Sequence, residues 1–144
     1  MSTDTKNVHL FGAYLIRALL LASGILAAGI AATILFAPDA FYTGYGIDVG
    51  SNVNLANELK APAGLLLIAG LLMLIGVFRA GFIVPSLATA TVIYLTYGAS
   101  RLLSMTLDGA PDSALVTAAM LEIAVGTACL FALTAVRRAV ASAS

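Results

Sequence analysis

The chain has 144 residues, of which 61% are apolar and 10% are charged, whereas soluble domains average about 45–50% apolar and about 25% charged residues. Seven acidic and seven basic side chains cancel, and so few charges cannot cover the surface of a soluble domain of this size. This composition excludes an ordinary soluble enzyme, a disordered chain and a nucleic-acid-binding protein, and it predicts an integral membrane protein.

Four apolar segments are long enough to cross a bilayer, which takes roughly 20 residues of helix. The first covers about residues 10–37, and the second is the uncharged run over 61–78. The third covers about 81–105, and the fourth covers about 113–136. Polar and apolar residues do not alternate in these runs, which favours helices over the strands of a β-barrel. We therefore expect an all-α protein with one four-span domain over residues 1–144.

The first segment begins after Lys6 and contains Arg17, and a signal peptide also follows basic residues. It is longer than the roughly 7–15 apolar residues of a signal peptide, so we interpret it as the first membrane span. Three small residues in it lie four positions apart: Gly24, Ala28 and Ala32. This spacing is a weak dimerisation signal and serves packing within one chain equally well.

A long loop over residues 38–60 separates the first two spans. It carries Phe41, Tyr42 and Tyr45 directly after the end of the first span. Aromatic rings favour the headgroup region, so we interpret these residues as an interfacial anchor. The alternative is a lid over a pocket that opens outward.

The other two connections are short turns, over residues 79–81 and 108–112. Asp112 or Ser113 can cap the fourth helix, and Pro62 is placed in the first turn of the second span, where proline is tolerated. Short turns make neighbouring helices antiparallel, so we expect an up-down four-helix bundle.

The distribution of basic residues predicts how the chain is oriented. Four of them fall on the side shared by both termini and the second connection: Lys6, Arg79, Arg137 and Arg138. Two fall at the opposite ends of the spans: Lys60 and Arg101. Because basic residues accumulate in the cytoplasm, we expect both termini there and the loop over 38–60 on the outer side of a bacterial inner membrane.

The third segment carries a polar stripe. Five polar residues recur at spacings of three and four positions and therefore share one helical face: Tyr97, Ser100, Arg101, Ser104 and Asp108. A charge near the membrane centre costs roughly 2.5–3.5 kcal/mol on insertion scales, so such residues usually face the interior of a bundle. We expect this stripe to point into the bundle.

The fourth segment contains one acidic residue, Glu122. At 1.5 Å per residue it lies ~13 Å along the helix from Ser113, close to the middle of the membrane. Its neighbours on the helix are small, which allows close approach of another helix: Ala118, Ala119, Gly126 and Cys129.

Depth along the helices leaves two ways to pair these charges. We favour a network in which the planar guanidinium of Arg101 bridges Glu58 and Glu122. The alternative pairs Arg17 with Glu122, and a protonated Glu122 would need no cation.

The charged network has a structural and a functional interpretation. In the first, the ion pairs lock the four helices into one register. In the second, an outward-facing polar pocket binds a lipid headgroup or a small metabolite, and a proton relay is a weaker third interpretation. The candidate ligand-binding residues are Glu58, Tyr97, Arg101, Asp108 and Glu122.

Motifs of known enzymes are absent from the sequence. The single histidine, His9, is interpreted as an interfacial residue, and without a histidine pair or a cysteine cluster we expect no metal, no cofactor and no catalytic residue. The leading hypothesis is a non-enzymatic lipid or small-ligand binder, or an accessory subunit. Its expected partners are membrane lipid and either a membrane protein or a second copy, but no nucleic acid. The competing hypothesis is a small membrane enzyme, such as an isomerase, that uses Glu122 as acid and base.

Short landmarks follow one another along the chain: residues 37–41 (APDAF), 57–61 (NELKA), 101–104 (RLLS), 108–111 (DGAP) and Glu122. In their order and spacing they resemble a bacterial family of small four-helix integral membrane proteins that is classified as a domain of unknown function. The similarity runs from Leu10 to Arg138. The resemblance implies a four-helix membrane fold, and it brings no established activity.

Overall fold

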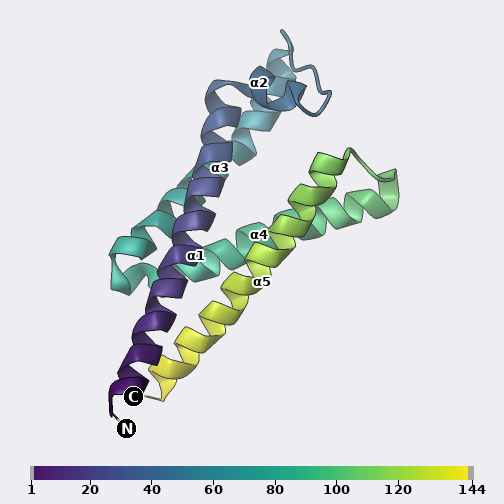
Figure 1. Cartoon of the computed structure of the whole chain (residues 1–144). Helices are drawn as coiled ribbons and strands as arrows, with labels where there is room; N and C mark the ends of the chain where they lie inside the picture. The colour runs from purple at the N-terminus through teal and green to yellow at the C-terminus, as the bar shows by residue number, and fades with distance from the viewer. Residues whose placement is uncertain (1, 143–144) are drawn as a thin grey trace.

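A computed structural model describes residues 2–142, and it describes side chains from residue 12 onward. The side chains of Lys6 and His9, to which the sequence assigned a role in orientation and an interfacial position, lie outside the described residues. Within residues 2–142 the chain forms helices and no strand. Figure 1 shows these elements in order: α1 (Ser2–Phe36), α2 (Pro38–Thr43), α3 (Val53–Phe78), the short 3-10 turn η1 (Ala80–Phe82), α4 (Ile83–Asp108) and α5 (Ser113–Ala141).

Four of these segments are long and apolar enough to cross a membrane: Gly12–Phe36, Val53–Phe78, Ala80–Asp108 and Ser113–Ala141. Large apolar side chains project from their outer faces; Leu65 is 66% exposed, Ile68 is 64% exposed and Phe131 is 70% exposed. Side chains of this kind on every outer face require an apolar solvent. The prediction of an all-α membrane bundle is confirmed.

The helix α3 begins earlier than the sequence predicts. The side chain of Asn52 caps it by accepting a hydrogen bond of 3.0 Å from the backbone N–H of Leu55. The polar residues over 53–60, expected in a loop, therefore form the first turns of the helix. The placement of Pro62 in the first turn is wrong, because Pro62 lies well inside α3.

The turn between α4 and α5 matches its sequence signals. Gly109 has a φ of +98°, a conformation that side chains with a Cβ rarely adopt. Asp112 caps α5 and accepts a hydrogen bond of 2.8 Å from the N–H of Ala114. These local interactions reverse the chain and place α5 beside α4 (Figure 1).

Small residues bring α1 and α3 into backbone contact. A Cβ atom added to Gly70 would lie 2.7 Å from the backbone nitrogen of Ala28 and 3.0 Å from the carbonyl oxygen of Gly24. No side chain larger than hydrogen fits between the two helices at this point. The small residues Gly24 and Ala28 of the first span thus pack within the chain.

The helices α4 and α5 meet in the same way. A Cβ atom on Gly126 would lie 2.9 Å from the backbone nitrogen of Leu95, and one on Gly98 would lie 3.2 Å from that of Ile123. Ala119 precedes Ile123 by four positions and so shares its helical face, and it is also buried, with 1% of its surface exposed. The expected close approach of a second helix beside Glu122 is present, and α4 makes it.

The α1–α3 pair and the α4–α5 pair contact each other less extensively than the two helices within each pair do. Ser86 in α4 donates a hydrogen bond of 2.7 Å to the carbonyl oxygen of Leu72 in α3, directly across the η1 turn. The Tyr94 hydroxyl donates one of 2.7 Å to the carbonyl oxygen of Ser23 in α1. Leu20 of α1 and Met73 of α3 belong to the apolar core and are fully buried. From this junction the two pairs diverge toward α2 (Figure 1).

The α1–α3 contact generates a testable prediction. Gly70→Ala should lower the free energy of unfolding by about 1–3 kcal/mol, because the added methyl group meets backbone atoms that cannot move aside. Gly64→Ala is the matched control in the same helix, since its Cβ would meet nothing within 4 Å. Thermal unfolding in detergent measures both, and equal stability of the two variants would contradict the packing described here.

Candidate functional site

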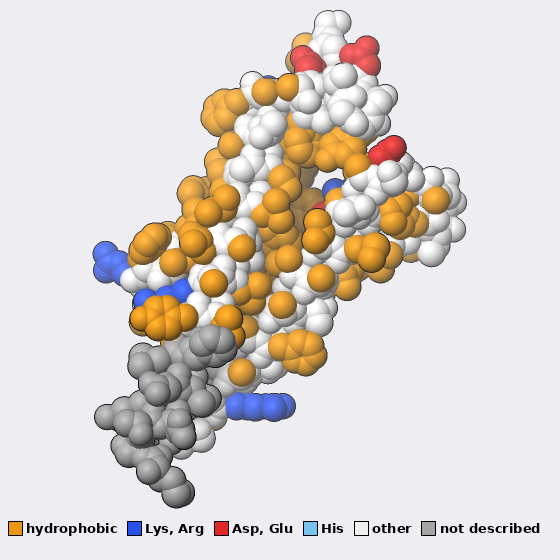
Figure 2. Space-filling model, viewed as in Figure 1, with side chains coloured by type: hydrophobic (Ala, Val, Ile, Leu, Met, Phe, Trp, Pro, Cys, Tyr) orange, Lys and Arg blue, Asp and Glu red, His pale blue; other side chains and the backbone are white. Residues whose placement is uncertain are grey.

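A cavity of about 360 Å³ occupies the space between the diverging helix pairs. Figure 2 shows the molecule hollowed there, below α2, with basic and acidic side chains inside the hollow. Apolar side chains from all four long helices line its walls, among them Ile34 of α1, Leu66 of α3 and Leu115 of α5. Small residues, including Ala63 and Ala118, keep the space open.

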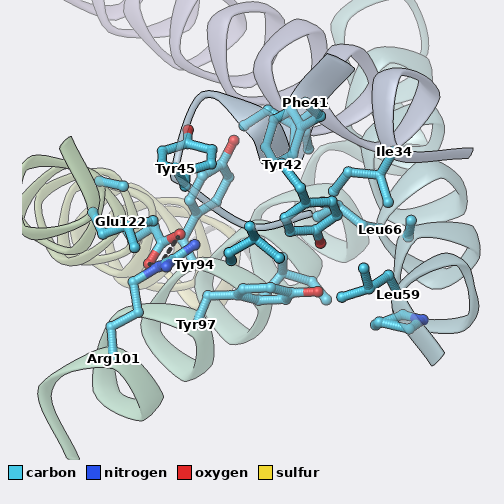
Figure 3. A pocket seen from close by; sticks show the side chains of 18 residues that line it. Ile34, Phe41, Tyr42, Tyr45, Leu59, Leu66, Tyr94, Tyr97, Arg101 and Glu122 are labelled. Carbon is cyan, nitrogen blue, oxygen red and sulfur yellow. Dashed lines mark hydrogen bonds and ion pairs between the residues drawn. The ribbon is translucent and has the colours of Figure 1, made fainter. Parts of the chain in front are cut away.

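An aromatic cluster forms the roof of the cavity. Phe41, Tyr42 and Tyr45 all line it, with ring centroids 5.1 Å apart for Phe41 and Tyr42 and 5.4 Å apart for Phe41 and Tyr45 (Figure 3). The chain turns back after α2 because the N–H of Tyr45 bonds to the carbonyl oxygen of Tyr42 at 2.9 Å and Gly46 has a φ of +71°. This arrangement fits the alternative drawn from the sequence, a lid over a pocket, and the favoured interfacial anchor stays a prediction.

Tyr94 also lines the cavity and connects it to the junction of the helix pairs. Only 5% of this residue is exposed, and its hydroxyl bonds to Ser23. Sequence reasoning did not single out Tyr94. Its spacing of three from Tyr97 and seven from Arg101 places it on the same helical face, which is the signal that could have found it.

One ion pair forms part of the cavity wall. The Nε–H of Arg101 is shared between the two carboxylate oxygens of Glu122, at 3.1 Å to Oε1 and 3.0 Å to Oε2 (Figure 3). The side chain of Arg101 is 33% exposed and that of Glu122 is 16% exposed. Within the described part of the chain, the two terminal NH₂ groups of Arg101 have no partner. The predicted contact between these helices is present, and it leaves four arginine N–H donors available.

Glu58 does not take part in this ion pair. It is exposed, and the cavity is lined instead by the next residue, Leu59, and by Pro62 and Ala63. One residue turns the helix by about 100°, so Glu58 projects to one side of the face on which Leu59 lines the cavity. The favoured network, in which Arg101 bridges Glu58 and Glu122, is therefore wrong for Glu58, and Arg101 pairs with Glu122.

The polar stripe on α4 is directed inward only in part. Tyr97 and Arg101 line the cavity, whereas Ser104 and Asp108 are exposed and lie outside it. Asp108 accepts a hydrogen bond of 2.9 Å from the Ser104 hydroxyl near the end of the helix. The stripe leaves the interior because α4 and α5 diverge from the other pair toward this end (Figure 1).

Arg17 does not pair with Glu122, which was the alternative. Arg17 is exposed on the surface of α1, and the described residues give it no hydrogen bond or ion pair. A long arginine side chain near the end of a span can extend along the helix to the membrane surface.

Tyrosine hydroxyls add hydrogen-bonding capacity to the cavity. Those of Tyr42 and Tyr97 have no hydrogen-bond partner in the described part of the chain. Burial raises the pKa of the Tyr42 hydroxyl above its ordinary value, so that group stays protonated at neutral pH and can donate a hydrogen bond. The cavity thus combines apolar walls with one ion pair and polar hydroxyls.

A family model described as "Domain of unknown function (DUF4345)" matches residues 15–133, which include every residue that lines the cavity. No curated protein and no solved structure matches the chain. The resemblance to a domain of unknown function with four membrane-spanning helices is thereby confirmed, and the chain belongs to the DUF4345 family of domains of unknown function.

Proposed function

We propose that this membrane protein binds a small amphipathic molecule in the cavity between its helix pairs, as a ligand-binding protein or an accessory subunit and not as an enzyme. The observation that carries the proposal is a cavity of about 360 Å³ with apolar walls and one accessible ion pair. Small-molecule sites typically measure roughly 300–1,000 Å³ and combine apolar walls with a few polar groups. The three sequence candidates retained for the site are Tyr97, Arg101 and Glu122.

The accessibility of the ion pair favours binding over a purely structural role. An ion pair that only held helices in register would need no hydrogen-bond donors beyond the one that pairs with the carboxylate. Arg101 instead keeps a third of its side chain exposed and leaves its terminal NH₂ groups unpartnered within the described residues. These donors are positioned to contact a polar group inside the cavity.

A membrane enzyme that uses Glu122 is the second candidate. One observation supports it: Glu122 lines a cavity instead of being enclosed by packed side chains. Both of its oxygens, however, accept the Nε–H of Arg101, so this contact already takes part of the capacity of Glu122 to accept a proton or a hydrogen bond. A bound molecule that is converted with time into a second compound, separated from the first by chromatography even where the two have the same mass, would favour the enzyme if the conversion is absent in Glu122→Gln.

We also propose an inner-membrane location with both termini in the cytoplasm and the cavity in the outer half of the membrane. The ends of the chain lie opposite α2 (Figure 1), and Arg137 and Arg138 are at their side of the bundle. The basic residues of that side support this orientation.

Blocking the cavity should abolish binding. Ala118→Phe should reduce retention of a host-derived small molecule, or of added monoolein, at least about tenfold, because the ring fills the cavity. The measurement is native mass spectrometry of the detergent-purified protein. Ala124→Phe is the control, since this alanine is exposed on the same helix and lies outside the cavity. Wild-type protein that retains neither molecule would contradict the proposal.

The orientation can be tested by labelling. Asp48→Cys should react with a membrane-impermeant maleimide in spheroplasts of a bacterial host, because Asp48 is exposed in the segment after α2. Cys129 is buried and should stay unlabelled, so it serves as the internal control. Labelling of Asp48→Cys only after the membrane is broken would reverse the orientation.

A further inference from the structure

The cavity has a mouth between two membrane-spanning helices. Ile30 and Ile34 of α1 and Leu115 and Ala118 of α5 form part of its lining, and all four lie within the candidate spans. The two helices approach each other near the Ser23–Cys129 contact, where oxygen and sulfur are 4.0 Å apart. Beyond that point they diverge, and Figure 2 shows the hollow between them.

The end of the cavity near α2 is covered. The rings of Phe41, Tyr42 and Tyr45 form the roof. Val49, in the loop between α2 and α3, is buried, with only 2% of its surface exposed. A mouth between spans faces the hydrocarbon of the bilayer, whereas the roof faces the membrane surface. Entry from the bilayer is therefore less obstructed than entry from water.

The charges of the cavity restrict what fits inside it. Among its lining residues, the charged ones are Arg101 and Glu122, and their formal charges cancel. A headgroup with a net charge would leave an uncompensated charge in an apolar environment, which is costly. A headgroup that carries both an anionic and a cationic group can instead pair with each partner while the sum stays zero.

We infer that the ligand is a membrane amphiphile with a zwitterionic headgroup, which enters from the bilayer between α1 and α5. Its anionic group contacts the free NH₂ groups of Arg101, and its ammonium group contacts Glu122. A cavity of about 360 Å³ is near the lower limit for small-molecule sites, so it holds the headgroup while the tails extend through the mouth. This inference rests on the proposed function and specifies its ligand class.

Competition between defined lipids tests the inference. Delipidated protein in detergent is mixed with phosphatidylethanolamine, phosphatidylglycerol or the tail-free glycerophosphoethanolamine, and native mass spectrometry measures one-to-one complexes. Wild type should prefer the zwitterionic lipid about tenfold over the anionic lipid, and the tail-free molecule should bind weakly. These three probes separate headgroup charge from the requirement for a lipid tail.

Two variants make the charge argument specific. Glu122→Gln leaves the cavity with a net positive charge, so the preference should invert toward phosphatidylglycerol. Glu58→Gln removes the same charge from an exposed site outside the cavity and should leave the preference unchanged. The double variant Arg101→Gln with Glu122→Gln keeps the cavity neutral, leaves no uncompensated charge to hinder folding, and should bind both lipids weakly.

The possible failures are distinguishable. A wild-type preference for phosphatidylglycerol, or an unchanged preference in Glu122→Gln, would overturn the zwitterionic headgroup while leaving the binding function intact. Binding of glycerophosphoethanolamine as tight as that of the lipid would overturn entry from the bilayer. If folded wild-type protein bound none of the three molecules but still retained monoolein or a host-derived molecule, the zwitterionic ligand would be overturned and the proposed function would stand. If it retained none of these molecules, the proposed function would be contradicted as well.

Discussion

At Gly70 the backbone of α3 approaches that of α1 so closely that a single methyl group would not fit between them. Such contacts matter in a bilayer because apolar side chains gain little by leaving lipid for a protein neighbour, so association depends on close packing. Gly126 plays the same role between α5 and α4. The helices are consequently held in two tight pairs, and the pairs share a smaller contact around Tyr94 and Ser23. The divergence of the pairs creates the cavity.

The ion pair lies where this divergence begins to open the molecule. Arg101 and Glu122 belong to the same tight pair of helices, so their contact needs no support from α1 or α3. The other pair of helices contributes apolar side chains on the facing wall, and α2 contributes the aromatic roof. Charge on one wall and hydrocarbon on the other produce an amphipathic space. This is the physical reason why an amphiphile suits the cavity better than a wholly polar or wholly apolar molecule.

Sequence reasoning recovered the four spans and the Arg101–Glu122 contact, because uncharged runs and helical spacing are local properties. The prediction of site residues failed where a shift of one position along a helix decides which side chain lines the cavity. The depth of Glu58 predicted a contact with Arg101, but Leu59 is the residue that lines the cavity. Asp108 shares the face of Arg101, yet the divergence of α4 carries it away from the cavity. Neither the angle between helix pairs nor the start of α3 at Val53 is encoded in hydropathy.

By itself the sequence determined the solvent of this protein, since a chain with 10% charged residues and four long apolar runs requires a bilayer. It also determined that Arg101 and Glu122 must lie away from the lipid hydrocarbon, because a charged side chain in lipid is costly. Only the tertiary structure decided that this place is a cavity wall and that Phe41, Tyr42 and Tyr45 cover it. The reason is that a cavity arises from how helix pairs diverge, which depends on contacts between residues far apart in the chain and not on the character of any single segment.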